Sequence, residues 1–397
     1  MLTGSVMAEI IFLGTLLVLG YHYVGYPITL ALIARWRGAQ PIRPGGVTPT
    51  VTLIISAYNE EEVLRSKLEN VLALDYPRDR LEIIVASDGS TDATAAIARE
   101  LAPRGVVLHH YDTNRGKNAV LNDTVPRARG ALIVFTDANG MYRPDALRKL
   151  VAYFDNPSVG CVCGELIYLN YSDNAIAEGY GTYWRFDQLQ KRLESRLHTL
   201  LGANGSIFAI RRSLYQKLPN TVCNDMVTPI LIAAAGHAVV YAPDAVSTEA
   251  GSQDLADELR RRPRIIARGI LGVRAVWGEV VRSRRWLLAW ELFWRKRVRY
   301  AMPFLLAILL ASSAALEQPW NLLFPAQLAV YGIAPIAAAL PNGRIRRLLT
   351  PALYFGVGTL AAALAWARLF VGHDVSRWET AARPHERGEL KSVRGAG

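Results

Sequence analysis

The chain has 397 residues, of which 51% are hydrophobic, and its mean hydropathy of +0.15 is high for a protein that lies entirely in water. Its 45 basic and 34 acidic residues give a net charge of +11 at pH 7. This composition excludes a disordered chain and a small disulfide-stapled domain, and it allows one large domain together with elements that lie in lipid.

The first predicted element is a transmembrane helix within residues 1–36. Residues 10–34 contain no Asp, Glu, Lys or Arg, and a helix of this length crosses a hydrocarbon core of about 30 Å. A cleaved signal peptide is the alternative, but the residues before the apolar run include no Lys or Arg and carry Glu9. We therefore expect a helix that stays in the membrane as an anchor.

Residues 37–260 have the pattern of an α/β domain, which begins with a Pro- and Gly-containing linker at 38–49. Short apolar runs predict strands over 51–56, 81–86, 106–109 and 131–135, and the stretches between them predict helices over 61–74 and 92–101. Strands that alternate with helices predict a mostly parallel sheet. In such sheets ligands collect at the carboxyl ends of the strands.

Acidic residues follow two of these strands. Asp88 follows the second strand, where it is expected to hydrogen-bond the uracil or ribose of a nucleotide, whereas Asp92 in the same turn is expected to cap the next helix. Asp137 follows the fourth strand and can give one ligand to Mg²⁺ or Mn²⁺, with a neutral oxygen from Asn139. The cation would neutralise charge on a departing diphosphate. A plain turn is the alternative for Asp-Ala-Asn-Gly.

Two further segments have both a functional and a structural interpretation. Lys117 follows the third strand, so it can contact a diphosphate or it can be a solvated surface lysine. The segment 202–211 combines a Gly-containing loop with a strand, which permits close approach of the backbone to a ligand. A simple hairpin or bulge explains this second pattern equally well.

Asp225 is the candidate general base, because a carboxylate can accept a proton from an attacking sugar hydroxyl near neutral pH. Its neighbour Asn224 is neutral, so no like-charged partner is expected to raise the pKa of Asp225. The alternative is that Asp225 is the N-cap of a helix that continues through 227–235.

The last part of the chain is basic and then apolar. Between residues 260 and 300 there are 13 basic residues against two acidic ones, which predicts an interfacial helical segment at 261–299. Contact with anionic lipid headgroups or a diphosphate is favoured over nucleic-acid binding. Uncharged runs at 300–316, 318–343 and 348–367 predict about three transmembrane helices within 300–372, followed by a tail at 373–397.

Basic residues at the ends of the α/β domain determine its expected side of the membrane. Arg35 and Arg37 precede it, and the basic cluster at 295–299 follows it, so the positive-inside rule places the domain in the cytoplasm of a multi-pass inner-membrane protein. The same rule keeps the basic loop at 344–347 inside, so a further crossing by 348–367 would leave the tail outside.

Six motifs, in this order along the chain, resemble those of the inverting membrane-bound family 2 glycosyltransferases. This family includes cellulose, hyaluronan and chitin-oligosaccharide synthases and many bacterial exopolysaccharide enzymes, and the resemblance covers roughly residues 5–300. The motifs are Val-Thr-Leu-Ile-Ile-Ser-Ala-Tyr-Asn-Glu (51–60), Ser-Asp-Gly-Ser-Thr-Asp (87–92), Gly-Lys-Asn-Ala-Val-Leu-Asn (116–122), Thr-Asp-Ala-Asn (136–139), Gly-Ala-Asn-Gly-Ser-Ile-Phe-Ala-Ile-Arg-Arg (202–212) and Asn-Asp-Met-Val (224–227).

The resemblance implies a Rossmann-like GT-A fold and a nucleotide-sugar donor, most often a UDP-sugar. It implies that Asp225 is the catalytic base of a single inverting displacement and that Asp137 binds the metal, with Asn139 beside it. The implied donor-binding residues are Ala57, Tyr58, Glu60, Asp88, Lys117, Asp137 and Arg264, and the implied acceptor-binding residues are Asn204, Gly205 and Asn224.

Three departures from the family pattern limit what the resemblance implies. Asn139 replaces the second carboxylate of the usual Asp-x-Asp, which puts metal affinity in question. The Gln-x-x-Arg-Trp motif of polymerising members appears as 261–265 with only Arg264 matching, so processive synthesis is less secure than transfer itself. Residues 377–383 resemble a tail motif that some members fold over the active site, which conflicts with a tail outside the membrane.

The leading hypothesis is a glycosyltransferase that extends a polysaccharide or a lipid-linked sugar for the cell envelope. Transfer of one sugar to polyprenyl phosphate is a second hypothesis, and it would give a lipid product soluble in organic solvent. A third is a membrane protein whose soluble domain only binds nucleotide. The predicted spans carry no central charge of the kind that a translocation path often needs, which counts against a transporter.

Overall fold

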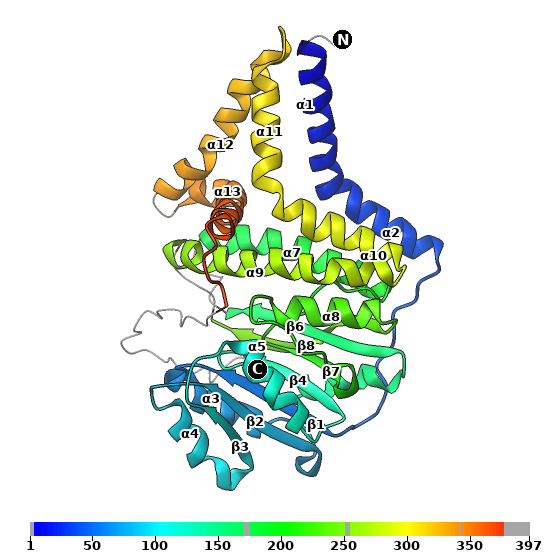
Figure 1. The fold of residues 1–397 in the computed structure, drawn as a ribbon, viewed down its shortest axis with the longest axis vertical. Coiled ribbons are helices and arrows are strands. Elements are labelled where there is room, and N and C mark those ends of the chain that lie inside the picture. Colours follow the sequence, from blue (N-terminus) through cyan, green and yellow to red (C-terminus); the bar gives the residue numbers. More distant parts are fainter. Residues whose placement is uncertain (1–3, 170–174, 251–254, 341–342, 377–397) are drawn as a thin grey trace.

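The computed structural model describes residues 4–169, 175–250, 255–340 and 343–376. It has three tiers along its long axis (Figure 1). A sheet with its covering helices forms one end, a layer of helices that includes α7 (Ala175–Arg196) and α9 (Leu255–Arg282) lies above it, and apolar helices project from the other end.

The sheet is mixed, with the strand order β3-β2-β1-β4-β7-β6-β8-β5. The four strands predicted from the sequence are present and pair in parallel, whereas β7 runs antiparallel to both β4 and β6, and β5 runs antiparallel to β8. The strands are β1 (Val51–Ala57), β2 (Leu81–Asp88), β3 (Val106–Tyr111), β4 (Leu132–Asp137), β5 (Met141–Tyr142), β6 (Val159–Tyr168), β7 (Phe208–Arg211) and β8 (Ala238–Glu249).

Strand register brings the polar turns together at one edge of the sheet. Ala57 at the end of β1 is level with Ser87 of β2, and Ser56 is level with Asp137 of β4. The strands form because their residues are apolar and largely β-branched, and every residue of β1 is buried. Since parallel strands end at the same edge, the side chains that follow them converge there.

Hydrophobic cores cover both faces of the sheet. One contains side chains from α3, α4 and α6, and the other contains side chains from α5 and α8 together with α9 and α10. These helices are α3 (Glu61–Leu72), α4 (Thr94–Glu100), α5 (Lys117–Thr124), α6 (Ala146–Val151), α8 (Asn224–Ala234) and α10 (Trp286–Leu292). The second core therefore joins the sheet to the helical layer above it.

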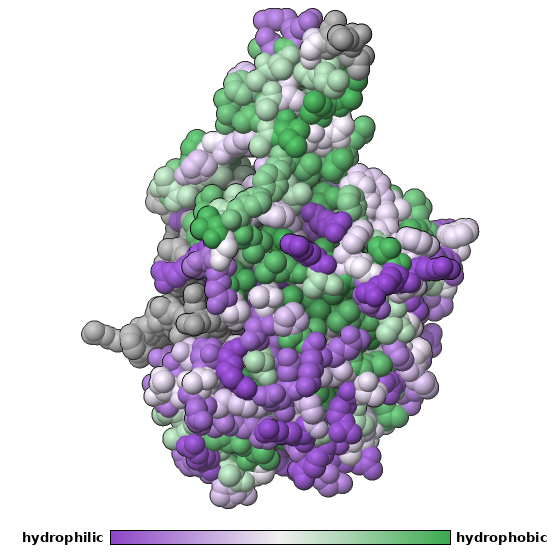
Figure 2. All heavy atoms as spheres, viewed as in Figure 1, coloured by the Kyte–Doolittle hydropathy of each residue, from purple (hydrophilic) through white to green (hydrophobic). Residues whose placement is uncertain are grey.

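Three helical segments among the described residues are long and apolar enough to cross a membrane. They are 4–36, Trp320–Ala339 and Leu348–Phe370, and a fourth span results if the pair Trp286–Val298 and Met302–Ala314, bent by 66°, counts as one. Hydrophobic side chains cover the projecting helices in Figure 2, whereas hydrophilic ones cover the sheet end. The elements are α1 (Gly4–Gly20), the π-helices η1 (Tyr21–Gly25) and η8 (Phe293–Val298), α2 (Tyr26–Trp36), α11 (Met302–Ala314), α12 (Leu323–Ala339) and α13 (Arg344–Phe370).

The last helix packs on α9, and the residues after it approach the sheet. α1, α11 and α12 extend away from the sheet, whereas α13 is seen nearly end on and lies across α9 (Figure 1). After α13 the chain descends toward the sheet, where Val375 packs against Ala267 of α9, and the carbonyl oxygen of Ser376 lies 2.9 Å from the position of a Cβ at Gly116. The tail up to Ser376 is thus on the side of the α/β domain. The motif at 377–383 lies outside the described residues.

Candidate active site

Asp137 and Lys117 form an ion pair at the carboxyl edge of the sheet. Asp137 is the last residue of β4, and Lys117 is the first residue of α5, directly after Gly116, whose φ of 94° suits a glycine. Lys117 Nζ lies 2.5 Å from Asp137 Oδ1, with side-chain exposures of 14% and 33%. The structure therefore places Lys117 in the site rather than on a solvated surface.

Asp225 meets Asp137 across a glycine. A Cβ at Gly205 would lie 3.0 Å from Asp137 Oδ2 and 3.5 Å from Asp225 Oδ2, so the missing side chain leaves the two carboxylates facing a common space. Ala203 N donates to the Asp225 carbonyl at 2.7 Å and ties this loop to α8. The helix begins at Asn224 with Cys223 as its N-cap, so Asp225 lies inside the first turn and does not cap the helix.

The charges around Asp225 differ from the sequence expectation. Burial raises the pKa of Asp225 above its usual value, and the neighbouring carboxylate of Asp137 raises this pKa further. Lys117, Arg268 and Lys296 oppose this rise. The expectation that no like-charged partner raises the pKa of Asp225 was wrong, because the partner comes from another strand rather than from the adjacent residue.

A third carboxylate, which the sequence reasoning missed, lies beside the first two. Glu249 ends β8 and accepts hydrogen bonds from Asn139 Nδ2 and from Ser206 Oγ, the latter at 3.0 Å. Burial raises the pKa of Glu249, and Asp137 raises it further. Asn139 thus points its amide group at Glu249, and Glu249 links the loop of Asp137 to the loop of Gly205.

A buried lysine supports the Asp137 loop from below. Lys67 of α3 is 0% exposed, donates to Thr136 Oγ1 at 2.8 Å and to the Gly140 carbonyl, and lies 4.2 Å from the centre of the Tyr142 ring. Burial lowers the pKa of Lys67 to about 7, against the opposing effect of Asp137 and Glu249. Lys67 holds the loop between β4 and β5 in place, and no local motif in the sequence indicates this role.

Asp88 has a structural role in this conformation. It is 0% exposed, and its two carboxylate oxygens accept hydrogen bonds of 2.8 Å from the backbone N–H groups of Arg115 and Gly116. Asp88 therefore holds the segment that leads into Lys117 and presents no open surface to a nucleoside. Burial raises the pKa of Asp88 more than these two N–H groups lower it.

The turn after β1 packs against the turn after β2. Asn59, with φ of 53°, accepts from Thr91 N at 2.8 Å. Asp92 accepts from the N–H of Thr94, the first residue of α4, at 3.0 Å, although the N-cap of this helix is Ala93. Tyr58 and Glu60 are partly exposed here, whereas Ala57 is fully buried. Of these three predicted donor-binding residues, only the first two have exposed surface.

Basic side chains of α9 and η8 lie above the site. Arg261 is close enough to Glu249 to lower its pKa, and Arg268 is close enough to Asp225 to lower its pKa. The predicted diphosphate ligand Arg264 is partly buried and falls on the same helical stripe, between Arg261 and Arg268. A Cβ at Gly202 would lie 3.7 Å from Lys296 Nζ, so η8 reaches the site as well.

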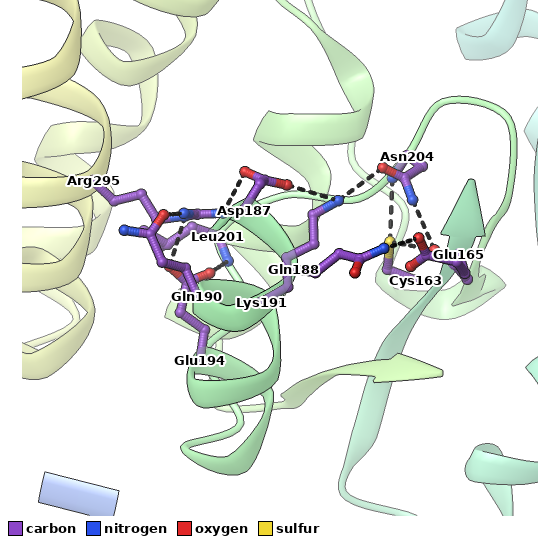
Figure 3. A network of polar contacts seen from close by, with 11 residues as sticks. Cys163, Glu165, Asp187, Gln188, Gln190, Lys191, Glu194, Leu201, Asn204 and Arg295 are labelled. Atoms are coloured by element: carbon purple, nitrogen blue, oxygen red, sulfur yellow. Dashed lines mark hydrogen bonds and ion pairs between the residues drawn. The ribbon is translucent and has the colours of Figure 1, made fainter. Parts of the chain in front are cut away.

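Of the predicted acceptor-binding residues, Asn204 is buried and bonded within the protein. Its Oδ1 accepts from Lys191 Nζ at 3.0 Å, and its Nδ2 donates to the Gly164 carbonyl at 2.8 Å. In Figure 3 this amide joins a network that runs through Lys191 and Asp187 to Arg295 of η8. Asn204 thus positions the loop from 202 to 206 and does not reach an open surface.

Asn224, by contrast, has an available donor. The residue is 6% exposed, and its Nδ2 has no hydrogen-bond partner among the residues that the structure describes. Asn224 is next to Asp225 in the chain, so its amide N–H group can contact a ligand that binds at this candidate general base. Spatial proximity alone links Asn224, Gly205, Asp137 and Lys117, since no sequence interval between these motifs indicates contact.

The residues present fit a divalent cation that is held largely by substrate. The described residues contain no group of three or more His, Cys, Asp or Glu side chains arranged to hold a metal by themselves. Mg²⁺ and Mn²⁺ usually take one or two protein carboxylates and complete their shells with waters and phosphate oxygens. Asp137 is accessible enough to be such a ligand, and Glu249 raises the local negative charge.

Comparisons with known proteins show what part of the chain is similar to them. Residues 52–219 match the family model of glycosyl transferase family 2. The beta-monoglucosyldiacylglycerol synthase of Synechocystis sp. is 30% identical over 187 residues, which are 44% of this chain and 39% of the synthase. An N-acetylglucosaminyltransferase of Azorhizobium caulinodans is 27% identical over 235 residues, 55% of this chain and 59% of that protein. These matches cover less than two thirds of either relative.

The fold matches over a longer part of the chain. The mannosyltransferase PcManGT from Pyrobaculum calidifontis, solved in complex with GDP-Man and Mn²⁺, superposes with a TM-score of 0.67 at 22% identity, covering 92% of this chain and 100% of that one. The overlap therefore includes the apolar helices as well as the sheet. The mixed Rossmann-like sheet is that of the GT-A fold, and the segment 52–219 within it is similar to glycosyl transferase family 2.

Proposed function

We propose that the protein is a membrane-bound, inverting glycosyltransferase that moves a sugar from a nucleotide sugar, a UDP-sugar in the simplest case, to a polysaccharide or a lipid-linked acceptor. The observation that carries this proposal is the approach of Asp137 and Asp225 to the same side of Gly205. It gives one carboxylate for the departing diphosphate end of the donor and one for the attacking hydroxyl, with space for the reacting atoms between them.

On the donor side, Lys117 and the arginines of α9 supply positive charge for the diphosphate. Lys117 is held in place by Asp137, and Asp88 fixes the segment before it through two backbone N–H groups. Tyr58 and Glu60, exposed at the end of β1, are proposed to contact the nucleotide, with Arg264 at the diphosphate. Asp88 and Ala57 act in this proposal by positioning these turns.

A divalent cation bound at Asp137 would neutralise charge on the leaving diphosphate. The base that activates the acceptor is supplied by the chain itself. Burial raises the pKa of Asp225, which makes this carboxylate a stronger base for a sugar hydroxyl than a fully exposed one. Attack from the Asp225 side, opposite the leaving diphosphate, is an in-line displacement, so the anomeric configuration inverts.

The acceptor side lies next to the membrane-facing helices. Lys296 of η8 approaches Gly202, and the loop from 202 to 206 is tied through Lys191 and Asp187 to Arg295. An acceptor at the lipid surface can therefore reach Asp225 without leaving the membrane plane. This placement supports a membrane-borne acceptor, and the basic layer supports a multi-pass protein with its catalytic domain on the cytoplasmic side of the inner membrane.

The proposal is tested with detergent-purified protein, a panel of nucleotide sugars and Mn²⁺ or Mg²⁺, by measuring nucleotide release and then sizing the product. Release with one UDP-sugar and a glycan or glycolipid product supports it. A long product indicates processive synthesis, and a single-sugar product that partitions into organic solvent indicates transfer to a lipid. No release with any UDP-, GDP- or dTDP-sugar, in the presence of native membrane lipids, would contradict it.

A further inference from the structure

Glu249 occupies an unusual position for a carboxylate. It comes from the end of β8, 110 residues after Asn139, and receives hydrogen bonds from Asn139 Nδ2 and Ser206 Oγ. Both donors are neutral. Among the described residues no lysine or arginine forms an ion pair with Glu249, although Asp137 is close enough to raise its pKa.

The surroundings of Glu249 contain a second unsatisfied group. Ser247 lies two residues earlier on β8, so its side chain is on the same face of the strand. It is 0% exposed, its Oγ has no hydrogen-bond partner within the described part of the chain, and it lies 3.0 Å from the position of a Cβ at Gly140. An unpartnered hydroxyl and a carboxylate without an ion pair thus face the Asp137 loop together.

Two neighbouring, partly buried carboxylates cost free energy unless positive charge compensates them. Lys67 supplies one charge from beneath the loop, but its hydrogen bonds go to Thr136 and to the Gly140 carbonyl rather than to the carboxylates. Lys117 bonds Asp137 on Oδ1. Asp137 and Glu249 thus bring two carboxylates to the loop at 137–140 from separate strands.

We propose that Glu249 supplies the second carboxylate of the divalent-cation site, in the place left by the neutral Asn139. Asn139 is then a positioning residue, because its amide N–H orients Glu249 and leaves the remaining lone pairs of that carboxylate for the cation. This inference rests on the proposed metal-dependent transfer. It explains how the motif at 137–139 can bind a cation with a single acid, because the second carboxylate comes from another strand.

The test is the affinity for Mn²⁺ of the full chain in detergent, measured with UDP from the electron paramagnetic resonance signal of free Mn²⁺. Glu249→Gln keeps the size of the side chain and removes its charge, so we expect the Kd for Mn²⁺ to rise by about tenfold to a hundredfold. The double variant Asn139→Asp with Glu249→Gln returns a carboxylate to the motif and is expected to recover most of the lost affinity.

Ser206→Ala is the matched control for a structural role. It removes the neutral hydrogen bond to Glu249 but leaves the carboxylate, so the Kd for Mn²⁺ should change far less than in Glu249→Gln. If Glu249→Gln binds Mn²⁺ as the wild type does, Glu249 is not a ligand. The inference is also overturned if Ser206→Ala loses as much affinity for Mn²⁺ as Glu249→Gln. It is overturned as well if the double variant is folded and recovers no affinity for Mn²⁺.

The same measurements separate this inference from the proposed function. A protein that binds Mn²⁺ through Glu249 but releases nucleotide from no sugar donor would contradict the proposed transfer and leave the metal ligand in place. A protein that transfers sugar with undiminished Mn²⁺ affinity in Glu249→Gln would contradict the metal ligand and leave the transfer in place.

Discussion

Asp137 and Asp225 lie on separate elements, β4 and α8, yet each directs its Oδ2 toward the position that a Cβ would take at Gly205, at 3.0 Å and 3.5 Å. The carboxylate of Asp137 raises the pKa of Asp225. The pair therefore places the candidate base, Asp225, next to a carboxylate that can bind a cation, Asp137. Gly205 keeps the space between the two side chains open.

Gly205→Ala is expected to lower kcat/KM by about a hundredfold while the protein stays folded, because the added methyl would displace the Asp137 carboxylate from its working position. Steady-state nucleotide release measures the loss. Gly202→Ala is the matched control in the same loop, since its Cβ would meet Lys296 Nζ at an ordinary 3.7 Å. Equal activity in the two variants would show that the space at Gly205 is not used.

Lys117→Met is expected to shift the acidic limb of the pH–rate profile to higher pH. Lys117 lowers the pKa of Asp225, so removing this cation raises that pKa further above the usual 3.8, and the base becomes deprotonated only at higher pH. The KM for the donor should also rise, by about tenfold or more for a lost charged contact. Lys149→Met, which removes an exposed pair with Asp145, is the control. An unmoved limb in Lys117→Met would refute the electrostatic link.

The tail up to Ser376 is expected to be on the catalytic side of the membrane, because Ser376 lies against Gly116. In a variant that lacks the partly exposed Cys223, Ser376→Cys should react with a membrane-impermeant maleimide in inverted vesicles and not in intact spheroplasts. Glu317→Cys, between α11 and α12, should show the opposite pattern. Labelling of Ser376→Cys from the outside would contradict this topology.

The sequence predicted the parallel half of the sheet well because its strands are continuous apolar runs that end in polar turns. Asp137 and Lys117 were candidates for the same local reason, since each follows a predicted strand, whereas Asp225 was chosen for its residue type and its match to a family motif. The antiparallel strand β7 and the link from β8 to the Asp137 loop depend on pairing between distant segments. Glu249 and Lys67 therefore had no signal in the sequence, since neither belongs to a motif and each acts through residues far along the chain.

The direction of the last apolar helix could not be predicted from the sequence. Hydropathy reports that the run at 348–367 prefers lipid, but it does not report the direction of the helix axis. α13 lies across α9, and its apolar residues Ala365 and Leu369 pack in one cluster with Ala267 of α9. The alternative interpretation of Asp225 as an N-cap was wrong, because the helix begins at Asn224, one residue before Asp225.

The most direct test of the central claim compares nucleotide release with nucleotide binding in the wild type and in Asp225→Asn, using the active donor with Mn²⁺. A base acts in the transition state, so we expect kcat to fall by about a hundredfold to ten-thousandfold while the Kd for UDP stays near that of the wild type. Full release activity in Asp225→Asn, or an equal loss of binding and release, would contradict the assignment of Asp225 as the base.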